Sequence, residues 1–89
     1  MIKARNVFTS YNKSGPVETT GANSVMFINQ GDGNITLNGT VIIGPDASFS
    51  IAQVSSDVVD DTEYTIVFAE GATINSCIVV KVGVYKTGC

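Results

Sequence analysis

The sequence contains no histidine, and this absence excludes most catalytic chemistry. Ser-His-Asp and Cys-His catalysis both use an imidazole as the base. Two cysteines without histidine do not make a zinc site, and no glycine-rich loop opens a predicted helix that would bind phosphate. We therefore predict that the protein is not an enzyme and that it carries no cofactor.

Charged residues are scarce: they make up 15% of the 89 residues, whereas an ordinary soluble domain carries roughly 25%. This scarcity suggests that other subunits cover part of the surface. Abundant Ser, Thr, Asn and Gly offer another explanation, because they solvate a surface without charge. The net charge is −3, and the few Lys and Arg residues form no basic run, so we do not expect nucleic-acid binding.

Long apolar runs are also missing. The strictly apolar runs, such as Val25–Ile28, are far shorter than the ~20 residues that cross a bilayer. The first residues, "MIKARNVFTS", lack the apolar segment of a secretory signal. Two cysteines make no disulfide framework, so we expect Cys77 to be a buried free thiol. A bridge between Cys77 and Cys89 is the alternative.

The chain has room for a single domain, residues 1–89. No window repeats its apolar positions at helical spacing, and short strands alternate with turn signals about every ten residues. Residues 12–23 are rich in Gly, Ser, Thr and Pro and are predicted to form a loop. We predict an all-β fold of about seven antiparallel strands, either a small β-sandwich or a jelly-roll-like barrel.

Asn38-Gly39 is typical of a two-residue turn, in which both residues need a positive φ. That turn would place Leu37 opposite Thr40 and Ile35 opposite Ile42. Ile42 would then face the core together with Ile35 and Leu37.

Period-2 alternation in two separate segments predicts most of the core. The residues predicted to line it are Phe49, Ile51, Tyr64, Ile66 and Phe68. In the last strand, Cys77–Tyr85, we expect the alternate residues Ile78, Val80, Val82 and Val84 to point inward.

Two kinds of ligand site have weak support. The acidic residues Asp57, Asp60, Asp61 and Glu63 could offer oxygen ligands to calcium, although acidic residues are also ordinary in solvated loops. A sugar site would use exposed aromatic rings, for which Tyr11 and Tyr85 are the unassigned candidates.

The stretch from Ile28 to Phe68 resembles small virion proteins of tailed bacteriophages. The shared pattern stands here as "INQGDGNITLNG", "GPDASFSI" and "DDTEYTIVF". Asp46 departs from it, since a glycine is more usual at that position. The resemblance implies a capsid auxiliary or decoration protein, or the head-attached part of a fibre, that is assembled into virions in the host cytoplasm.

We therefore expect a structural virion protein that docks on the major capsid protein as a homo-oligomer, with a trimer favoured. Residues 1–14 would form either a strand of the domain or an N-terminal arm that reaches a neighbour, through Ile2, Val7, Phe8 and Tyr11. The alternative function is a carbohydrate-binding or adhesin-like module.

Overall fold

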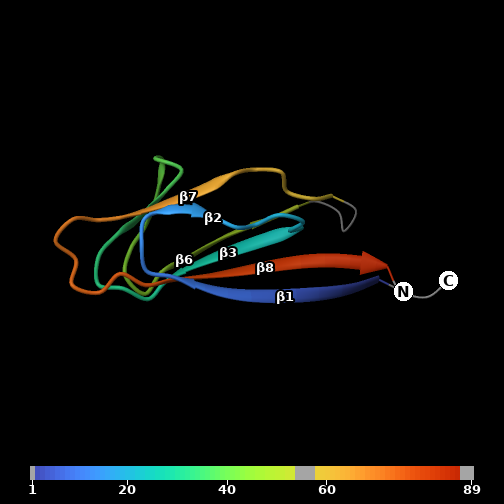
Figure 1. Cartoon of the computed structure of the whole chain (residues 1–89), viewed down its shortest axis with the longest axis horizontal. Coiled ribbons are helices and arrows are strands. Elements are labelled where there is room, and N and C mark those ends of the chain that lie inside the picture. The colour runs from blue at the N-terminus through green and yellow to red at the C-terminus, as the bar shows by residue number, and fades with distance from the viewer. Residues whose placement is uncertain (1, 54–57, 87–89) are drawn as a thin grey trace.

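The computed structural model describes residues 2–53 and 58–86, and these residues form strands joined by turns and loops, with no helix (Figure 1). The strands are β1 (Ile2–Tyr11), β2 (Gly15–Val17), β3 (Ser24–Asn29), β4 (Ile35–Leu37), β5 (Val41–Ile43), β6 (Ser48–Ala52), β7 (Tyr64–Phe68) and β8 (Cys77–Lys86).

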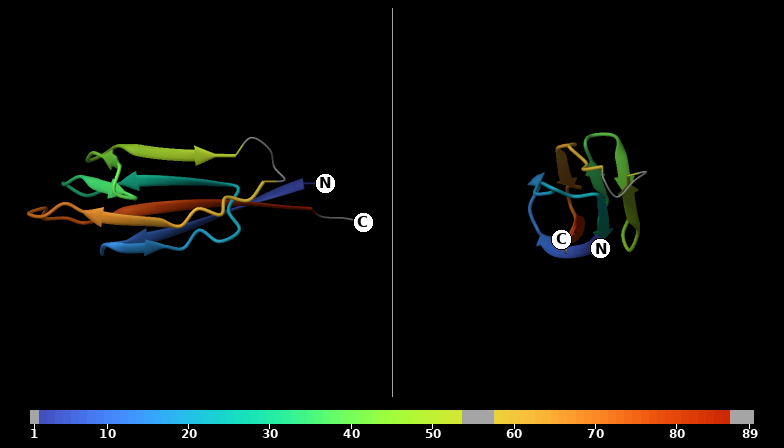
Figure 2. Two further views of the ribbon diagram at one scale, coloured as in Figure 1. Left: turned by 90° about the horizontal axis from the view of Figure 1, so that it is seen from above. Right: turned by 90° about the vertical axis from the view of Figure 1, so that its right-hand side faces the viewer.

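Two four-stranded sheets pack face to face, which confirms the predicted β-sandwich (Figure 2). Their strand orders are β1-β8-β3-β6 and β2-β7-β4-β5, and every pair is antiparallel. The structure has one strand more than the sequence predicts, because β2 lies inside the stretch 12–23 that was expected to be a loop. Three residues that include Pro16 are too few to show a strand period.

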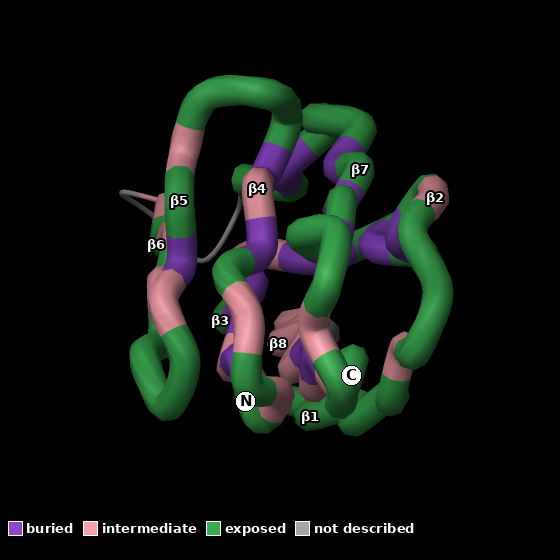
Figure 3. Tube along the Cα trace, turned by 90° about the vertical axis from the view of Figure 1, so that its left-hand side faces the viewer, coloured by how far each residue is buried: buried purple, intermediate pink, exposed green. Residues whose placement is uncertain are grey.

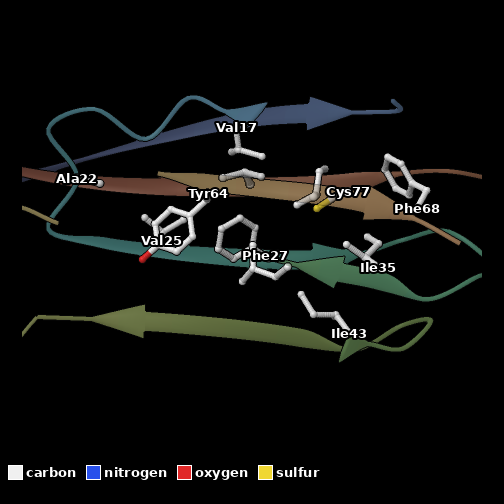
Figure 4. Packing of buried hydrophobic residues seen from close by; sticks show 12 residues of the cluster. Val17, Ala22, Val25, Phe27, Ile35, Ile43, Tyr64, Phe68 and Cys77 are labelled. Atoms are coloured by element: carbon white, nitrogen blue, oxygen red, sulfur yellow. The ribbon is translucent and has the colours of Figure 1, made fainter. Parts of the chain in front are cut away.

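The core lies between the sheets and is built by alternate residues of β3, β4, β7 and β8 (Figures 3 and 4). Tyr64, Ile66 and Phe68 are buried in it, while Phe49 and Ile51 are half-buried and pack against it. The predicted core set is therefore confirmed. The rings of Phe27 and Tyr64 meet edge to face with their centroids 5.3 Å apart, an arrangement that adds to the burial of both rings.

The predicted orientation of the last strand is wrong. Cys77 and Val79 are the fully buried residues of β8. The side chains predicted to point inward therefore belong to the opposite face of the strand; they are those of Ile78, Val80, Val82 and Val84. The strand is apolar on both faces, and for that reason its alternation alone could not show which face turns inward.

The positive φ predicted for Asn38 and Gly39 is confirmed, but the predicted two-residue turn is wrong: the loop spans residues 38–40, and the register differs by one residue. Asn38 and Gly39 have φ values of 49° and 70°, and Leu37 pairs with Val41 rather than with Thr40. The added loop residue turns Ile42 outward, where it is 67% exposed, and buries Ile43 instead. β7 holds this loop, because Asn38 accepts a hydrogen bond from the Thr65 N–H at 2.7 Å and donates its own N–H to the Thr65 carbonyl at 2.9 Å.

Asn29, at the end of β3, joins the two sheets through its buried amide. Its Nδ2 donates to the carbonyls of Gly33 and Ile43, at 2.8 and 2.9 Å, and its Oδ1 accepts from the Gly31 N–H at 2.9 Å. Its backbone bonds the turn before β6, with its N–H donating to Ala47 and its carbonyl accepting from Asp46. All the polar groups of this buried residue therefore have partners.

β1 and β8 are each ten residues long and pair along their whole length. β3 pairs with β8 only as far as Val82, so residues 83–86 pair with β1 alone and the two strands run on beyond the sandwich (Figure 1). This extension makes the molecule 53 Å long and only 20 and 19 Å across. The segment predicted to be a strand or an arm therefore contributes residues 2–11 to the chain's own sheet.

Replacing Asn29 with Ala leaves the carbonyls of Gly33 and Ile43 and the N–H of Gly31 without their side-chain partner. We expect the free energy of unfolding to fall by about 2–4 kcal/mol, since each buried group that loses its partner is costly. Denaturant titration would measure it. Asn34→Ala is the matched control, because Asn34 is exposed, and it should change stability by less than ~0.5 kcal/mol. Equal losses in the two variants would contradict the role given to Asn29.

Replacing Gly39 with Ala tests the turn. A Cβ on Gly39 would meet no atom within 4 Å, so the cost of about 1 kcal/mol comes from the positive φ alone. Gly44→Ala serves as the control, since its Cβ would make only an ordinary contact and no unusual φ is needed. A melting temperature that is the same for Gly39→Ala as for the wild type would contradict the turn geometry.

Candidate assembly surface

The outer face of the β1-β8-β3-β6 sheet carries apolar side chains that no other element of the described chain covers. Residues opposite each other in an antiparallel pair share a face. Val80 is opposite Phe8 on one side and Met26 on the other, while Ile78 is opposite Ser10 and Ile28. Phe8, Met26, Ile28, Ile78 and Val80 form a continuous group, which we call the apolar stripe.

The phase of the buried residues places the apolar stripe outside the core. Val25, Phe27 and Val79 are at most 1% exposed. Their immediate neighbours along the same strands point to the opposite face of the sheet. Phe8 is 69% exposed and Met26 is 39% exposed, while the remaining three members are partly exposed. Large apolar side chains gathered on one open face are typical of an interaction surface.

Polar residues border the apolar stripe. Ser48 and Ser50 of β6 lie beside Ile28 and Met26 and are exposed, and Ser10 lies next to Ile78. The outer face of the second sheet differs, because Thr36 separates its exposed residues Ile42 and Val67. The first sheet therefore has the more continuous apolar surface.

The structure separates the four residues expected to mediate assembly. Phe8 belongs to the apolar stripe, whereas Val7 and Tyr11 point to the opposite face of β1, as their odd positions predict. Val7 is 39% exposed. The backbone of Ile2 pairs with Lys86, and the side chain of Ile2 lies outside the described part of the structure.

Tyr11 packs against the core, and its hydroxyl accepts a hydrogen bond from the Glu18 N–H at 3.0 Å. Its ring is therefore half-buried and does not present the open face on which a sugar would stack. The side chain of Tyr85, the other candidate for a sugar site, lies outside the described part of the structure.

The acidic residues considered for calcium do not converge. Asp57 lies outside the described residues, and Asp61 and Glu63 are exposed. Asp60 is turned inward and is 7% exposed. Among the described residues, no three His, Cys, Asp or Glu side chains are placed to hold a metal ion.

Asp60 stabilises the fold, whereas the sequence had suggested it as a calcium ligand. Its carboxylate accepts hydrogen bonds from the Tyr64 hydroxyl and, at 2.9 Å, from the Thr62 N–H. Burial acts to raise the pKa of Asp60, but the hydrogen bonds from Tyr64 and Thr62 outweigh it and leave the pKa below its ordinary value of 3.8. Burial and the bond to Asp60 raise the pKa of Tyr64 above its ordinary 10.0.

An open cleft of about 800 Å³ lies beside Asp60, between residues 16–21 and 59–65. Glu18 lines it, and its carboxylate accepts a hydrogen bond from the Thr20 N–H at 2.6 Å. Hydrogen bonding to the Thr20 side chain, and then to its N–H, lowers the pKa of Glu18. Because the carboxylates of Glu18 and Asp60 already have partners within the chain, the cleft carries no defined ligand site.

Cys77 is a buried free thiol, as predicted, and burial raises its pKa. A thiol with a raised pKa is a poor nucleophile. Cys89, its alternative partner in a disulfide, lies outside the described residues.

The apolar stripe was missed at the sequence level because Ile78 and Val80 were assigned to the core. The available signal was that the segments Ser24–Asn29 and Cys77–Val84 are apolar on both faces. In a two-layer sandwich only one face of each sheet meets the core, so the second apolar face had to be exposed.

No helix long and apolar enough to span a membrane occurs among the described residues. Comparisons of the chain with protein-family models, with curated proteins and with solved structures find no match.

Replacing Asp60 with Ala tests the buried pair. The variant leaves the Tyr64 hydroxyl without its acceptor. We therefore expect its free energy of unfolding at neutral pH to be about 2–3 kcal/mol lower than that of the wild type. Asp61→Ala, at the neighbouring exposed position, is the control and should stay within ~0.5 kcal/mol of the wild type.

The same pair predicts a pH dependence. Since the pKa of Asp60 is lowered by folding, its stabilising effect is present above pH 3.8 and is lost as pH falls through the folded-state pKa. The raised pKa of Tyr64 predicts a second loss as pH rises above 10.0. Melting temperatures across the pH range should fall less steeply in acid for Asp60→Ala than for the wild type, and identical acid limbs would contradict this account.

Proposed function

We propose that the protein is a structural component of a tailed-bacteriophage virion that docks on the capsid as an auxiliary or decoration protein. The observation that carries this proposal is the apolar stripe, a surface formed by the adjacent strands β1, β8 and β3. Such a surface suits permanent contact with a larger particle, because burying it removes exposed Phe and Met side chains from water.

The composition agrees with this role. Charged residues are scarce for a free surface, and interface centres are depleted in charge and enriched in Phe and Met. The absence of histidine removes the base that most hydrolytic sites use. We therefore assign the protein a structural role and no catalytic one.

The kind of particle comes from the sequence resemblance over residues 28–68 to small virion proteins of tailed bacteriophages. The partner would be the major capsid protein or another virion protein, met during assembly in the host cytoplasm. A carbohydrate-binding module is the weaker alternative, since Tyr11, one of its two aromatic candidates, packs against the core.

Docking is tested by the double variant Met26→Thr, Ile28→Thr, which makes the β3 side of the apolar stripe polar and keeps residues that favour strands. Phage carrying this variant should yield purified particles that lack the protein or lose most of it, measured by quantitative mass spectrometry. Ile42→Thr is the matched control, because it removes an exposed isoleucine from the other sheet, and its incorporation should equal that of the wild type.

Two outcomes would overturn the proposal. One is the absence of the wild-type chain from purified particles. The other is full incorporation of the double variant, which would show that docking does not use the apolar stripe.

A further inference from the structure

The backbone of β1 has a free edge, and its direction follows from the hydrogen bonds of β8. The Asn23 N–H donates to the Val82 carbonyl at 2.7 Å, so the polar groups of Val82 point toward β3 and away from β1. Residues opposite each other in antiparallel strands alternate between bonded and non-bonded pairs. Asn6, which is opposite Val82, therefore directs its N–H and carbonyl outward, and so do Ala4, Phe8 and Ser10.

This edge is much longer than the other three edges of the sandwich. β1 has ten residues, whereas β6 has five and β2 and β5 have three each, and β2 includes Pro16, which has no N–H. Proteins usually block exposed edges with proline, charge, bulges or short strands. In β1, Lys3 and Arg5 occupy the first half, but Asn6–Tyr11 contains no charge, proline or glycine.

From this geometry we infer that β1 pairs with β1 of a second copy of this chain, antiparallel and around a two-fold axis. In the antiparallel orientation the edge of β1 is complementary to the same edge of a second copy. The interface therefore closes after two subunits. The two sheets join into one, and its outer edges are then the five-residue β6 strands. This inference concerns self-association alone and does not depend on the particle to which the protein docks.

The side chains of β1 favour a register with Val7 opposite Val7 of the partner subunit. Four of the outward-directed residues then pair, Asn6 with Phe8 and Ala4 with Ser10. The two Phe8 rings become diagonal neighbours on the outer face, close enough for contact, and Phe8 is 69% exposed in the single chain. Lys3 and Arg5 come to lie opposite Tyr11 and Thr9, so the positive residues of the two strands stay apart.

Amide hydrogen exchange combined with light scattering tests the pairing on the purified full-length protein. The amides of Val7 and Thr9 point to β8 and are protected in any folded state. Protection of the Asn6 and Phe8 amides requires the second copy. We expect protection at all four positions and a mass twice the 9.3 kDa of the chain.

Asn6→Pro is the decisive variant, since it removes one outward N–H and leaves the bonds to β8 intact. It should halve the mass and expose the Phe8 amide to exchange while Val7 and Thr9 stay protected. Asn6→Thr keeps the N–H and should remain a dimer. If Asn6→Pro fails to fold, Phe8→Lys offers a second test, because it changes only an exposed side chain and places like charges side by side in the dimer.

A wild-type protein that is monomeric, with fast exchange at Phe8, would overturn the inference. So would a dimer or larger oligomer that persists in a folded Asn6→Pro or Phe8→Lys variant. Docking is tested separately, by the variants of Met26 and Ile28.

Discussion

The buried amide of Asn29 is the interaction on which the arrangement of the two sheets depends. Apolar packing holds the sheets together but is non-directional, so it does not by itself fix their register. Asn29 adds direction, because its amide bonds the carbonyl of Ile43 in the facing sheet and both ends of the turn at Gly31–Gly33. That turn lies so close to the loop before β8 that a Cβ on Gly31 would come within 2.3 Å of the Ile74 carbonyl oxygen.

The sequence predicted those parts of the fold in which one face of a strand is clearly polar. Phe49 and Ile51 alternate with Ser48 and Ser50, and they pack against the core while the two serines are exposed. β8 gave no such contrast, and its phase was predicted wrongly. The predicted register of the hairpin was wrong for another reason. Asn38 forms a hydrogen bond with Thr65, which is 27 positions away along the chain, and no local sequence pattern contains that contact.

The candidate ligand residues show the same limit. Asp60 looks like any acidic loop residue in the sequence, yet the fold brings it to the hydroxyl of Tyr64 and buries both groups. Its neighbours Asp61 and Glu63 stay exposed. Residue type and spacing indicated that oxygen ligands were available, but whether a carboxylate faces solvent or the core depends on the tertiary structure.

β1 connects the two surface features of the molecule. Its outward backbone groups form the free edge, and its Phe8 begins the apolar stripe that continues through Val80 to Met26. Pairing two β1 strands would provide hydrogen-bond partners for the free backbone groups of this edge. It would also place the two apolar stripes side by side on one extended sheet. A single stripe of five side chains is a small contact for a stable complex. A joined pair doubles that contact without any new residue, so self-association and docking on a particle would strengthen each other.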